Sequence, residues 1–238
     1  MNFKGKNILV VGGSSGIGLS LVKFLHEKDA VVYVISRSEN ADLPQGVKYY
    51  QADVTGELGP LAEFLPEQLH GLVYSVGSIN LKPFNRLSTD DFLNDYRINV
   101  LGAVQIIQQS LKQLKNAAGA SIVLISSVAA KTGLPYHASI SAAKGGVEGL
   151  ALALASELAT QQIRVNVIAP SLTDTPMAQN LLSTPEKREA SAKRHPLGKY
   201  GQPEDISQAI AFLLSENSSW VTGQVIGIDG GMGKLKTA

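Results

Sequence analysis

Short runs of apolar residues recur along the chain, and longer segments with apolar residues at helical spacing separate them. Several of the short runs are apolar almost throughout instead of alternating, which is typical of strands that helices cover on both faces of a sheet. Seven runs predict strands: Asn7–Val11, Val31–Ile35, Val47–Gln51, Leu72–Val76, Ser121–Ser126, Arg164–Ile168 and Gln224–Ile228. Five longer segments predict helices: Gly16–Lys28, about Leu58–Pro66, Thr89–Asn116, Ala138–Thr160 and Pro203–Glu216.

The order of these elements predicts the fold class. Strands that alternate with helices form right-handed βαβ units, in which consecutive strands run parallel and the helices pack on the sheet. We therefore expect an α/β fold with a doubly wound, parallel seven-stranded sheet and helices on both faces. The sequence contains no internal repeat, low-complexity segment or linker, so we expect residues 1–238 to form a single domain.

The composition narrows the classes of function. The 238 residues are 44% hydrophobic and 17% charged, and a chain of this size buries roughly 70–75% of its unfolded surface. Lys and Arg number 21 against 20 for Asp and Glu, so we expect neither nucleic acid nor a membrane surface as a partner. The absence of cysteine excludes disulfides, thiolate catalysis and cysteine-ligated metals. The four histidines are scattered along the sequence, so we expect no metal site.

The amino end of the sequence does not predict export. Its apolar run, Ile8–Val11, is too short for a signal peptide and leads directly into a glycine-rich turn. No window of about 18 apolar residues predicts a helix that spans a membrane. We therefore expect a cytoplasmic protein.

A glycine-rich turn connects the first predicted strand to the first predicted helix. It reads Gly12-Gly13-Ser14-Ser15-Gly16-Ile17-Gly18. Glycine permits tight turns and the close approach of a diphosphate, whose charge the amide N–H groups at a helix start can bind. The turn therefore predicts a dinucleotide site, and the alternative is a strand-to-helix connection without a ligand.

The end of the second predicted strand bears on the choice of dinucleotide. An acidic residue there would bind the adenosine ribose and favour NAD, but the sequence has Ser36 and Arg37. A guanidinium can pair with the 2′-phosphate of NADP, and each charge-assisted hydrogen bond contributes about 1.5–3 kcal/mol. We expect NADP(H) to be preferred, with NAD(H) as the alternative. Arg37 can also simply point into solvent.

Further motifs follow in order along the chain. Asp53-Val54 comes after the third strand, Asn99 lies within a helix, and Ser127 precedes Lys144. Carboxyl-terminal segments complete the pattern: Gly198–Asp205, Val221–Gln224 and Asp229–Gly231. Together these motifs resemble the short-chain dehydrogenase/reductase family over nearly the whole chain, and most closely the classical subgroup that includes 3-oxoacyl-carrier-protein reductases. The resemblance implies a Rossmann fold and hydride transfer between NADP(H) and a small carbonyl or alcohol substrate.

The resemblance also implies how the cofactor is held. The glycines of the first turn bind the phosphates, Asp53 and Val54 the adenine, and Lys144 the nicotinamide ribose. Pro170 and Thr175 contact the nicotinamide carboxamide. The expected cofactor-binding residues are Gly12, Ser14, Ser15, Gly16, Ile17, Gly18, Ser36, Arg37, Asp53, Val54, Gly77, Lys144, Pro170 and Thr175.

Three positions near the cofactor depart from the family pattern. Val11 stands where a threonine is usual, and Ser171 replaces a glycine. Tyr74-Ser75-Val76-Gly77 replaces Asn-Asn-Ala-Gly at the end of the fourth strand, where only the glycine is kept.

By the same resemblance, three residues serve the reaction directly. Asn99 supports a proton-relay water, Ser127 hydrogen-bonds the substrate oxygen, and Lys144 lowers the pKa of a neighbouring tyrosine. That tyrosine stands four residues before the lysine and thirteen after the serine, and both counts point to Ile140. Isoleucine has no proton to give, and general acid–base help is worth about 10² to 10⁴ in rate.

Four other groups are candidates for the missing proton donor. Tyr136 lies eight residues before Lys144, and Pro135 indicates a loop that can bring its phenol back toward the site. The other role for Tyr136 is to line the substrate pocket. His137, Ser141 and a water held by Asn99 and Lys144 are the remaining candidates. If none serves, we expect a catalytically impaired cofactor-binding protein that acts as a sensor or an oligomer partner.

Two further features follow from the family pattern. Small residues surround Lys144 on its helix, where the family forms subunit interfaces, so we expect a homodimer or homotetramer. The segment Leu172–His195 carries few apolar anchors among many charges and matches the family's substrate-binding lid. We expect its charges to form a solvated face, and the alternative is a site for an acidic partner.

Overall fold

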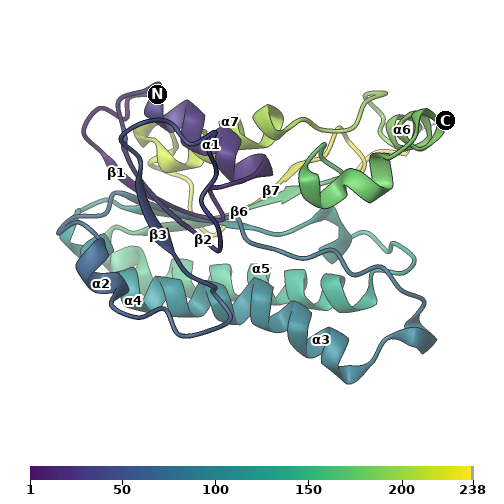
Figure 1. Cartoon of the computed structure of the whole chain (residues 1–238), viewed down its shortest axis with the longest axis horizontal. Helices are drawn as coiled ribbons and strands as arrows, with labels where there is room; N and C mark the ends of the chain where they lie inside the picture. The colour runs from purple at the N-terminus through teal and green to yellow at the C-terminus, as the bar shows by residue number, and fades with distance from the viewer. Residues whose placement is uncertain (237–238) are drawn as a thin grey trace.

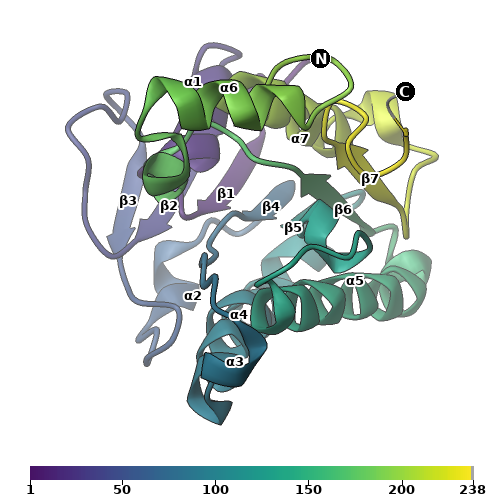
Figure 2. The ribbon, with the colours of Figure 1, turned by 90° about the vertical axis from the view of Figure 1, so that its right-hand side faces the viewer.

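The computed structural model describes residues 1–236, and Figure 1 and Figure 2 show one twisted sheet between two layers of helices. All seven strands pair in parallel in the order β3-β2-β1-β4-β5-β6-β7. This topology confirms the predicted α/β class with a doubly wound parallel sheet. The strands are β1 (Asn7–Val11), β2 (Val31–Ser36), β3 (Lys48–Gln51), β4 (Gly71–Tyr74), β5 (Ser121–Ile125), β6 (Arg164–Pro170) and β7 (Val225–Ile228).

The helices cover both faces of the sheet. In both views α1 and α7 lie on one face, and α2, α4 and α5 lie on the other. The apolar strands face a separate core on each side, because successive side chains of a strand point to opposite faces. In β1, for example, Leu9 and Val11 join the core under α4 and α5, whereas Ile8 and Val10 join the core under α1 and α7. The α-helices are α1 (Gly16–His26), α2 (Leu61–Phe64), α3 (Thr89–Tyr96), α4 (Gly102–Asn116), α5 (Ala138–Leu158), α6 (Pro185–Lys193) and α7 (Pro203–Leu214).

The largest correction concerns the helix predicted over Thr89–Asn116. The structure divides it into α3, a π-helical turn over Arg97–Leu101 and α4. The cause lies outside the segment. The buried hydroxyl of Tyr74, at the end of β4, donates a hydrogen bond to the Ile98 carbonyl, and a Cβ on Gly102 would lie 2.2 Å from that hydroxyl oxygen. A side chain inserted against the helix in this way opens its hydrogen-bond ladder.

Other differences concern the ends of elements. β4 ends at Tyr74, two residues before the predicted end at Val76. The helix predicted over about Leu58–Pro66 is a single turn, and β6 continues to Pro170. Within residues 1–236, no helix has the length and apolar character that crossing a membrane requires.

Candidate active site

A cleft of about 1050 Å³ opens at the carboxyl ends of the strands, the edge where open α/β sheets bind ligands. It runs from the glycine-rich turn and the end of β2, past the ends of β4 and β5, to the segment after β6. The residues proposed from the sequence line this cleft with three exceptions: Gly18 and Asn99 lie directly behind its wall, and Ser141 lines a neighbouring pocket. The structure therefore brings the predicted cofactor and reaction residues into one continuous space.

In the glycine-rich turn, a side chain in place of Gly12 or Gly18 would lie too close to neighbouring backbone atoms. A Cβ on Gly18 would lie 2.1 Å from the Gly12 carbonyl oxygen, so only glycine lets α1 start against the turn. Gly12 has a φ of +82°, and a Cβ there would lie 3.0 Å from the Ser75 backbone. Within residues 1–236 the Ser15 side chain makes no capping bond, and the first turn of α1 contains no acidic residue. The helix start is thus open to an anion, and the cradle fits a diphosphate.

The end of β2 presents a positive charge at the far end of the cleft. Arg37 is exposed, lines the cleft and forms no ion pair within the described part of the chain. Ser36 is buried and donates its hydroxyl to the Ser38 carbonyl at 2.9 Å. Hydrogen bonds from Thr55 hold the pKa of Asp53 below its ordinary value, and the charge of Arg37 adds to this effect. This end of the cleft therefore presents both a guanidinium and a carboxyl group to a ligand.

Ser127 and Lys144 both line the cleft. Ser127 follows β5, and its Oγ accepts a 3.2 Å hydrogen bond from the Ala129 N–H, so its own proton is available to a ligand. Lys144, on α5, is 7% exposed, and its Nζ donates to the Ile125 carbonyl at 2.7 Å. Burial lowers the pKa of Lys144 to about 8, and the negative charge of Asp95 acts against this effect. A buried ammonium of this kind can exchange its proton near neutral pH.

The position that the family pattern gives to tyrosine is filled by an apolar side chain. Ile140 lies one turn before Lys144 on α5, is 5% exposed and lines the cleft. Tyr136 lies at the cleft rim, where it is 58% exposed and has a left-handed φ of +68°. The adjacent His137 begins α5 without a side-chain cap, and its Nδ1 lies 2.7 Å from the Pro135 carbonyl oxygen.

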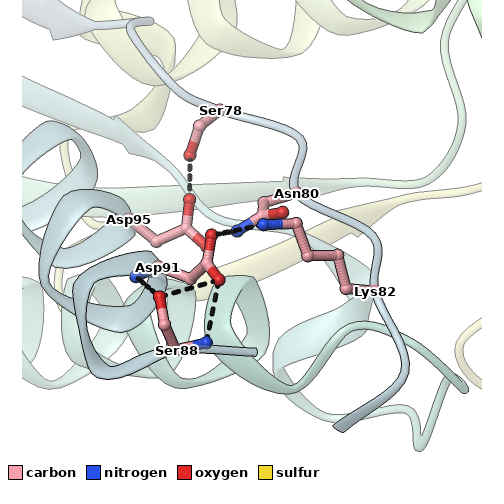
Figure 3. Close-up of polar contacts among 6 residues, drawn as sticks. All are labelled: Ser78, Asn80, Lys82, Ser88, Asp91 and Asp95. Carbon is pink, nitrogen blue, oxygen red and sulfur yellow. Dashed lines mark hydrogen bonds and ion pairs between the residues drawn. The ribbon is translucent and has the colours of Figure 1, made fainter. Parts of the chain in front are cut away.

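A polar cluster next to Asn99 reaches from the cleft lining to a buried carboxyl group, and the sequence pattern did not predict it. Asp95, on α3, is 2% exposed, and its Oδ1 accepts a 2.6 Å hydrogen bond from Ser78 (Figure 3). Asn99 Nδ2 donates to Ser78 Oγ at 3.1 Å and to the Asp95 carbonyl at 2.7 Å. A signal was present in the sequence, because Asp95 stands four residues before Asn99 and so shares its helix face.

The segment after β6 is anchored by a buried histidine. The ring of His195 lies between two oxygens, with Nε2 2.8 Å from Ser171 Oγ and Nδ1 2.8 Å from the Ser191 carbonyl. Because a carbonyl only accepts, Nδ1 carries the proton and Ser171 donates to Nε2. This bond joins the two ends of the predicted lid, which contains α6 and a 3₁₀ segment over Pro176–Leu182.

No group of three or more histidine, aspartate or glutamate side chains within residues 1–236 is placed to hold a metal ion. The chemistry available in the cleft is therefore that of Ser127, Lys144 and their neighbours, together with any bound dinucleotide. The glycine cradle and the cation at Arg37 fit such a dinucleotide at two separate points.

Comparisons with known proteins agree with this arrangement. A family model described as enoyl-(acyl carrier protein) reductase matches residues 11–233. The chain is 35% identical to the 3-oxoacyl-[acyl-carrier-protein] reductase FabG of Thermotoga maritima, over 98% of this chain and 99% of that protein. It is 32% identical to the L-xylulose reductase of Bos taurus, over 97% and 98% of the two chains.

Solved structures show the same similarity. A short-chain type dehydrogenase/reductase from Mycobacterium ulcerans has a TM-score of 0.89 and 28% identity, over 98% of this chain and 91% of that chain. A tyrosine-to-phenylalanine variant of ElxO with NADPH bound has a TM-score of 0.87 and 28% identity, over 96% and 98%. With the sheet order and the motifs in the cleft, these matches show that the chain belongs to the short-chain dehydrogenase/reductase family of NAD(P)-dependent oxidoreductases.

Proposed function

We propose that the protein is an NADP(H)-dependent reductase or dehydrogenase that acts on a small carbonyl or alcohol. One observation carries the proposal: a single cleft joins the glycine cradle and Arg37 at one end to Ser127 and Lys144 at the other. A cleft that is continuous between these two ends can hold a dinucleotide with its phosphates at the start of α1 and its nicotinamide next to a substrate. When bound, the nicotinamide supplies or accepts a hydride.

Each end of the dinucleotide has residues proposed to hold it. Gly12, Ser14, Ser15, Gly16, Ile17 and Gly18 form the diphosphate cradle, and Ser36 and Arg37 lie where an adenosine 2′-phosphate would be bound. Asp53 and Val54 border the adenine position, while Gly77, Lys144, Pro170 and Thr175 border the nicotinamide and its ribose. NADPH in a structural relative supports NADP(H) over NAD(H), as does the absence of an acid at positions 36 to 38.

Ser127 is proposed to hold the substrate oxygen. Because its Oγ accepts the Ala129 N–H, its hydroxyl proton can polarise a carbonyl or bind a developing alkoxide. The names of two relatives suggest the substrate classes to test first, 3-oxoacyl thioesters and small keto-sugars. The walls beyond Ser127 carry apolar side chains on several segments, and they suit an uncharged reacting group: Ile79, Leu81, Leu134, Met177, Leu181 and Met232.

A second function is favoured by the isoleucine at the tyrosine position. A protein that keeps the cofactor site but lacks an acid can act as a dinucleotide sensor or as a partner in an oligomer. The face of α5 and its neighbours leave large apolar side chains exposed, among them Leu152 at 63% and Trp220 at 99%. We propose that these side chains are covered in a homodimer or homotetramer, which sedimentation of the purified protein tests directly.

Calorimetric titration with NADPH and with NADH tests cofactor binding, on which the proposed activity depends. We expect saturable binding of NADPH that is tighter than binding of NADH. Oxidation of NADPH is then followed with acetoacetyl-coenzyme A and with L-xylulose as probe carbonyls. The absence of binding to either dinucleotide would refute the proposal, whereas binding without turnover of any probe would favour the sensor.

A further inference from the structure

Catalysis without a tyrosine at position 140 needs a proton donor or acceptor from elsewhere, and the inference that follows rests on the proposed function. Tyr136 is 58% exposed at the rim of the cleft. The Nδ1 of His137 is engaged by the Pro135 carbonyl, and Ser141 lines a separate pocket of about 350 Å³. Within residues 1–236, none of these three side chains is hydrogen-bonded to a buried acidic or basic group that could relay its proton.

Ser78 and Asp95 are placed differently, because the partly buried hydroxyl of Ser78 is hydrogen-bonded to a carboxyl group that is 2% exposed (Figure 3). Ser78 lies in the loop after β4 and lines the cleft together with Ser127 and Lys144. The carboxyl of Asp95 lies behind it, at a hydrogen-bond distance of 2.6 Å. Because an ionised carboxylate only accepts hydrogen bonds, Ser78 donates its proton to Asp95. Asn99 Nδ2 occupies one lone pair of the Ser78 oxygen, and the other remains for a ligand.

Asn99 connects this pair to Lys144. Its Nδ2 donates to Ser78 Oγ at 3.1 Å, which fixes the hydroxyl between Asn99 and Asp95. Its Oδ1 and Lys144 Nζ each lie 3.3 Å from the point where Gly77 would carry a Cβ, so the two atoms face the same spot beside the cleft. The negative charge of Asp95 also raises the pKa of Lys144 against the effect of burial. The four side chains thus form one interacting cluster.

Two acceptors in this cluster are unsatisfied. Asp95 Oδ2 and Asn99 Oδ1 are buried and have no hydrogen-bond partner anywhere in residues 1–236. Buried acceptors of this kind are rare in folded proteins, and each calls for an explanation. An aspartate is also seldom fully buried unless a partner compensates its charge. The charge of Asp95 interacts with that of Lys144 on α5. The nearby cation Lys82 is instead paired with Asp91, one turn earlier on α3.

We propose that Ser78 and Asp95 form a proton-transfer pair that carries out the acid–base step for which position 140 has no side chain. In alcohol oxidation, the substrate O–H bond breaks and its proton binds Ser78 Oγ, while the Ser78 proton moves to Asp95 Oδ1. The substrate carbon gives up a hydrogen with two electrons to the oxidised nicotinamide, and the C=O bond forms. Carbonyl reduction uses the same atoms in reverse, starting from protonated Asp95. Ser78 is the catalytic residue of the pair, and Asp95 acts through it.

The chain offers a matched control for removing the charge of Asp95. Asp91 lies one turn earlier on α3, and its carboxylate binds Lys82 and Asn80 and caps the helix with Ser88 (Figure 3). Asp91→Asn therefore removes one negative charge from the same helix without touching Ser78. The test compares this variant with Asp95→Asn, Ser78→Ala and Ser78→Thr, and with the unchanged chain.

Each protein is titrated with NADPH and assayed with acetoacetyl-coenzyme A and L-xylulose from about pH 5 to pH 10. We expect Asp95→Asn and Ser78→Ala each to lower kcat by about 10²-fold or more and to flatten one limb of the pH–rate profile. We expect the double variant to be no slower than either single variant, because residues that act as a unit are not additive. Ser78→Thr keeps the hydroxyl and retains most of the rate, and Asp91→Asn keeps the profile.

Several results would refute the proposal that Ser78 and Asp95 transfer the proton. One is an unchanged kcat and pH–rate profile in Asp95→Asn or Ser78→Ala. Another is turnover that appears only in Ile140→Tyr. The failure of the unchanged chain to bind NADPH is a different outcome, because it refutes the proposed function itself. Binding of NADPH by the variants within about threefold of the unchanged chain shows that they remain folded.

An NMR titration of the Lys144 side chain provides a readout that needs no turnover. Lys144 has a pKa of about 8, which Asp95 raises through its charge. We expect Asp95→Asn to lower this pKa and Asp91→Asn to leave it in place. An unchanged Lys144 pKa in Asp95→Asn would show that the cluster on which the proposal depends is not formed, whereas a lowered pKa supports the proposal only together with the loss of kcat.

Discussion

Replacing Arg37 by alanine isolates the charge at the end of β2. The guanidinium is exposed and has no ion pair within the described residues, so its removal costs the fold no internal salt bridge. The hydrogen bond that Gln51 donates to the Arg37 carbonyl is a backbone contact and survives the change. Each charge-assisted hydrogen bond to a phosphate is worth about 1.5–3 kcal/mol, and exposure places the value at the lower end. We therefore expect the Kd for NADPH to rise about 10-fold.

Titration calorimetry with both dinucleotides measures this effect. NADH has no 2′-phosphate, so we expect Arg37→Ala to change its Kd by less than about threefold. Arg37→Lys keeps the charge without the planar fork and should fall between the two proteins. Raising the salt concentration should reduce the NADPH preference of the unchanged chain, because the contact is exposed. Equal losses for NADPH and NADH would refute the reasoning, since they would show that Arg37 does not distinguish the two.

Three further changes test the site and the fold. Gly18→Ala sets a Cβ against the Gly12 carbonyl oxygen, so we expect a loss of about 1–3 kcal/mol in the free energy of unfolding by urea and weaker NADPH binding; unchanged stability and affinity would contradict this. The pKa of Lys144 falls from 10.5 to about 8 on folding, so the unfolded chain binds more protons between these pH values. The unchanged chain should therefore gain about 3 kcal/mol relative to Lys144→Met as the pH rises through this range; parallel unfolding curves would be evidence against it. Tyr74→Phe removes the hydrogen bond to the Ile98 carbonyl and should cost about 1–2 kcal/mol in thermal unfolding; a variant as stable as the unchanged chain would show that the bond does not hold the π-helical turn.

The parts of the fold that the sequence predicts are those with local signals. β1, the glycine-rich turn and α1 follow one another without interruption, and the conformation of each depends on its own residues. The apolar strands were found for the same reason, with ends that differ by one or two residues in most cases. The fixed glycine spacing likewise predicts the cradle, because a Cβ at Gly18 is excluded by the turn itself.

The break between α3 and α4 could not be predicted in this way. Residues 89–116 keep apolar positions at helical spacing throughout, so the pattern indicates one helix. The π-helical turn depends on the Tyr74 hydroxyl, which comes from a strand more than twenty residues earlier, and on the space that Gly102 leaves for it. Only the packing of β4 against this helix brings the two together.

The pair of Ser78 and Asp95 likewise combines a feature that is visible in the sequence with one that depends on the fold. The four-residue spacing of Asp95 and Asn99 is visible in the sequence and places both on one helix face. Ser78 is seventeen residues away and reaches Asp95 only because the loop after β4 runs past α3. Motif spacing points to Ile140 and its neighbour Tyr136, whereas the distance from Ser78 to Asp95 depends on the tertiary fold.

The π-helical turn over Arg97–Leu101 also sets the rotational phase of α3 relative to α4. Such a turn holds one residue more than an α-helical turn, and each residue of an α-helix advances the chain by about 100° around the axis. Deleting one residue there would let α3 and α4 form one continuous helix. If α4 stayed packed on the sheet, α3 would rotate by about 100° around the helix axis. Asp95 would then swing away from Ser78. A change of length by a single residue, far from the glycine cradle, therefore switches which side chains of α3 face Ser78.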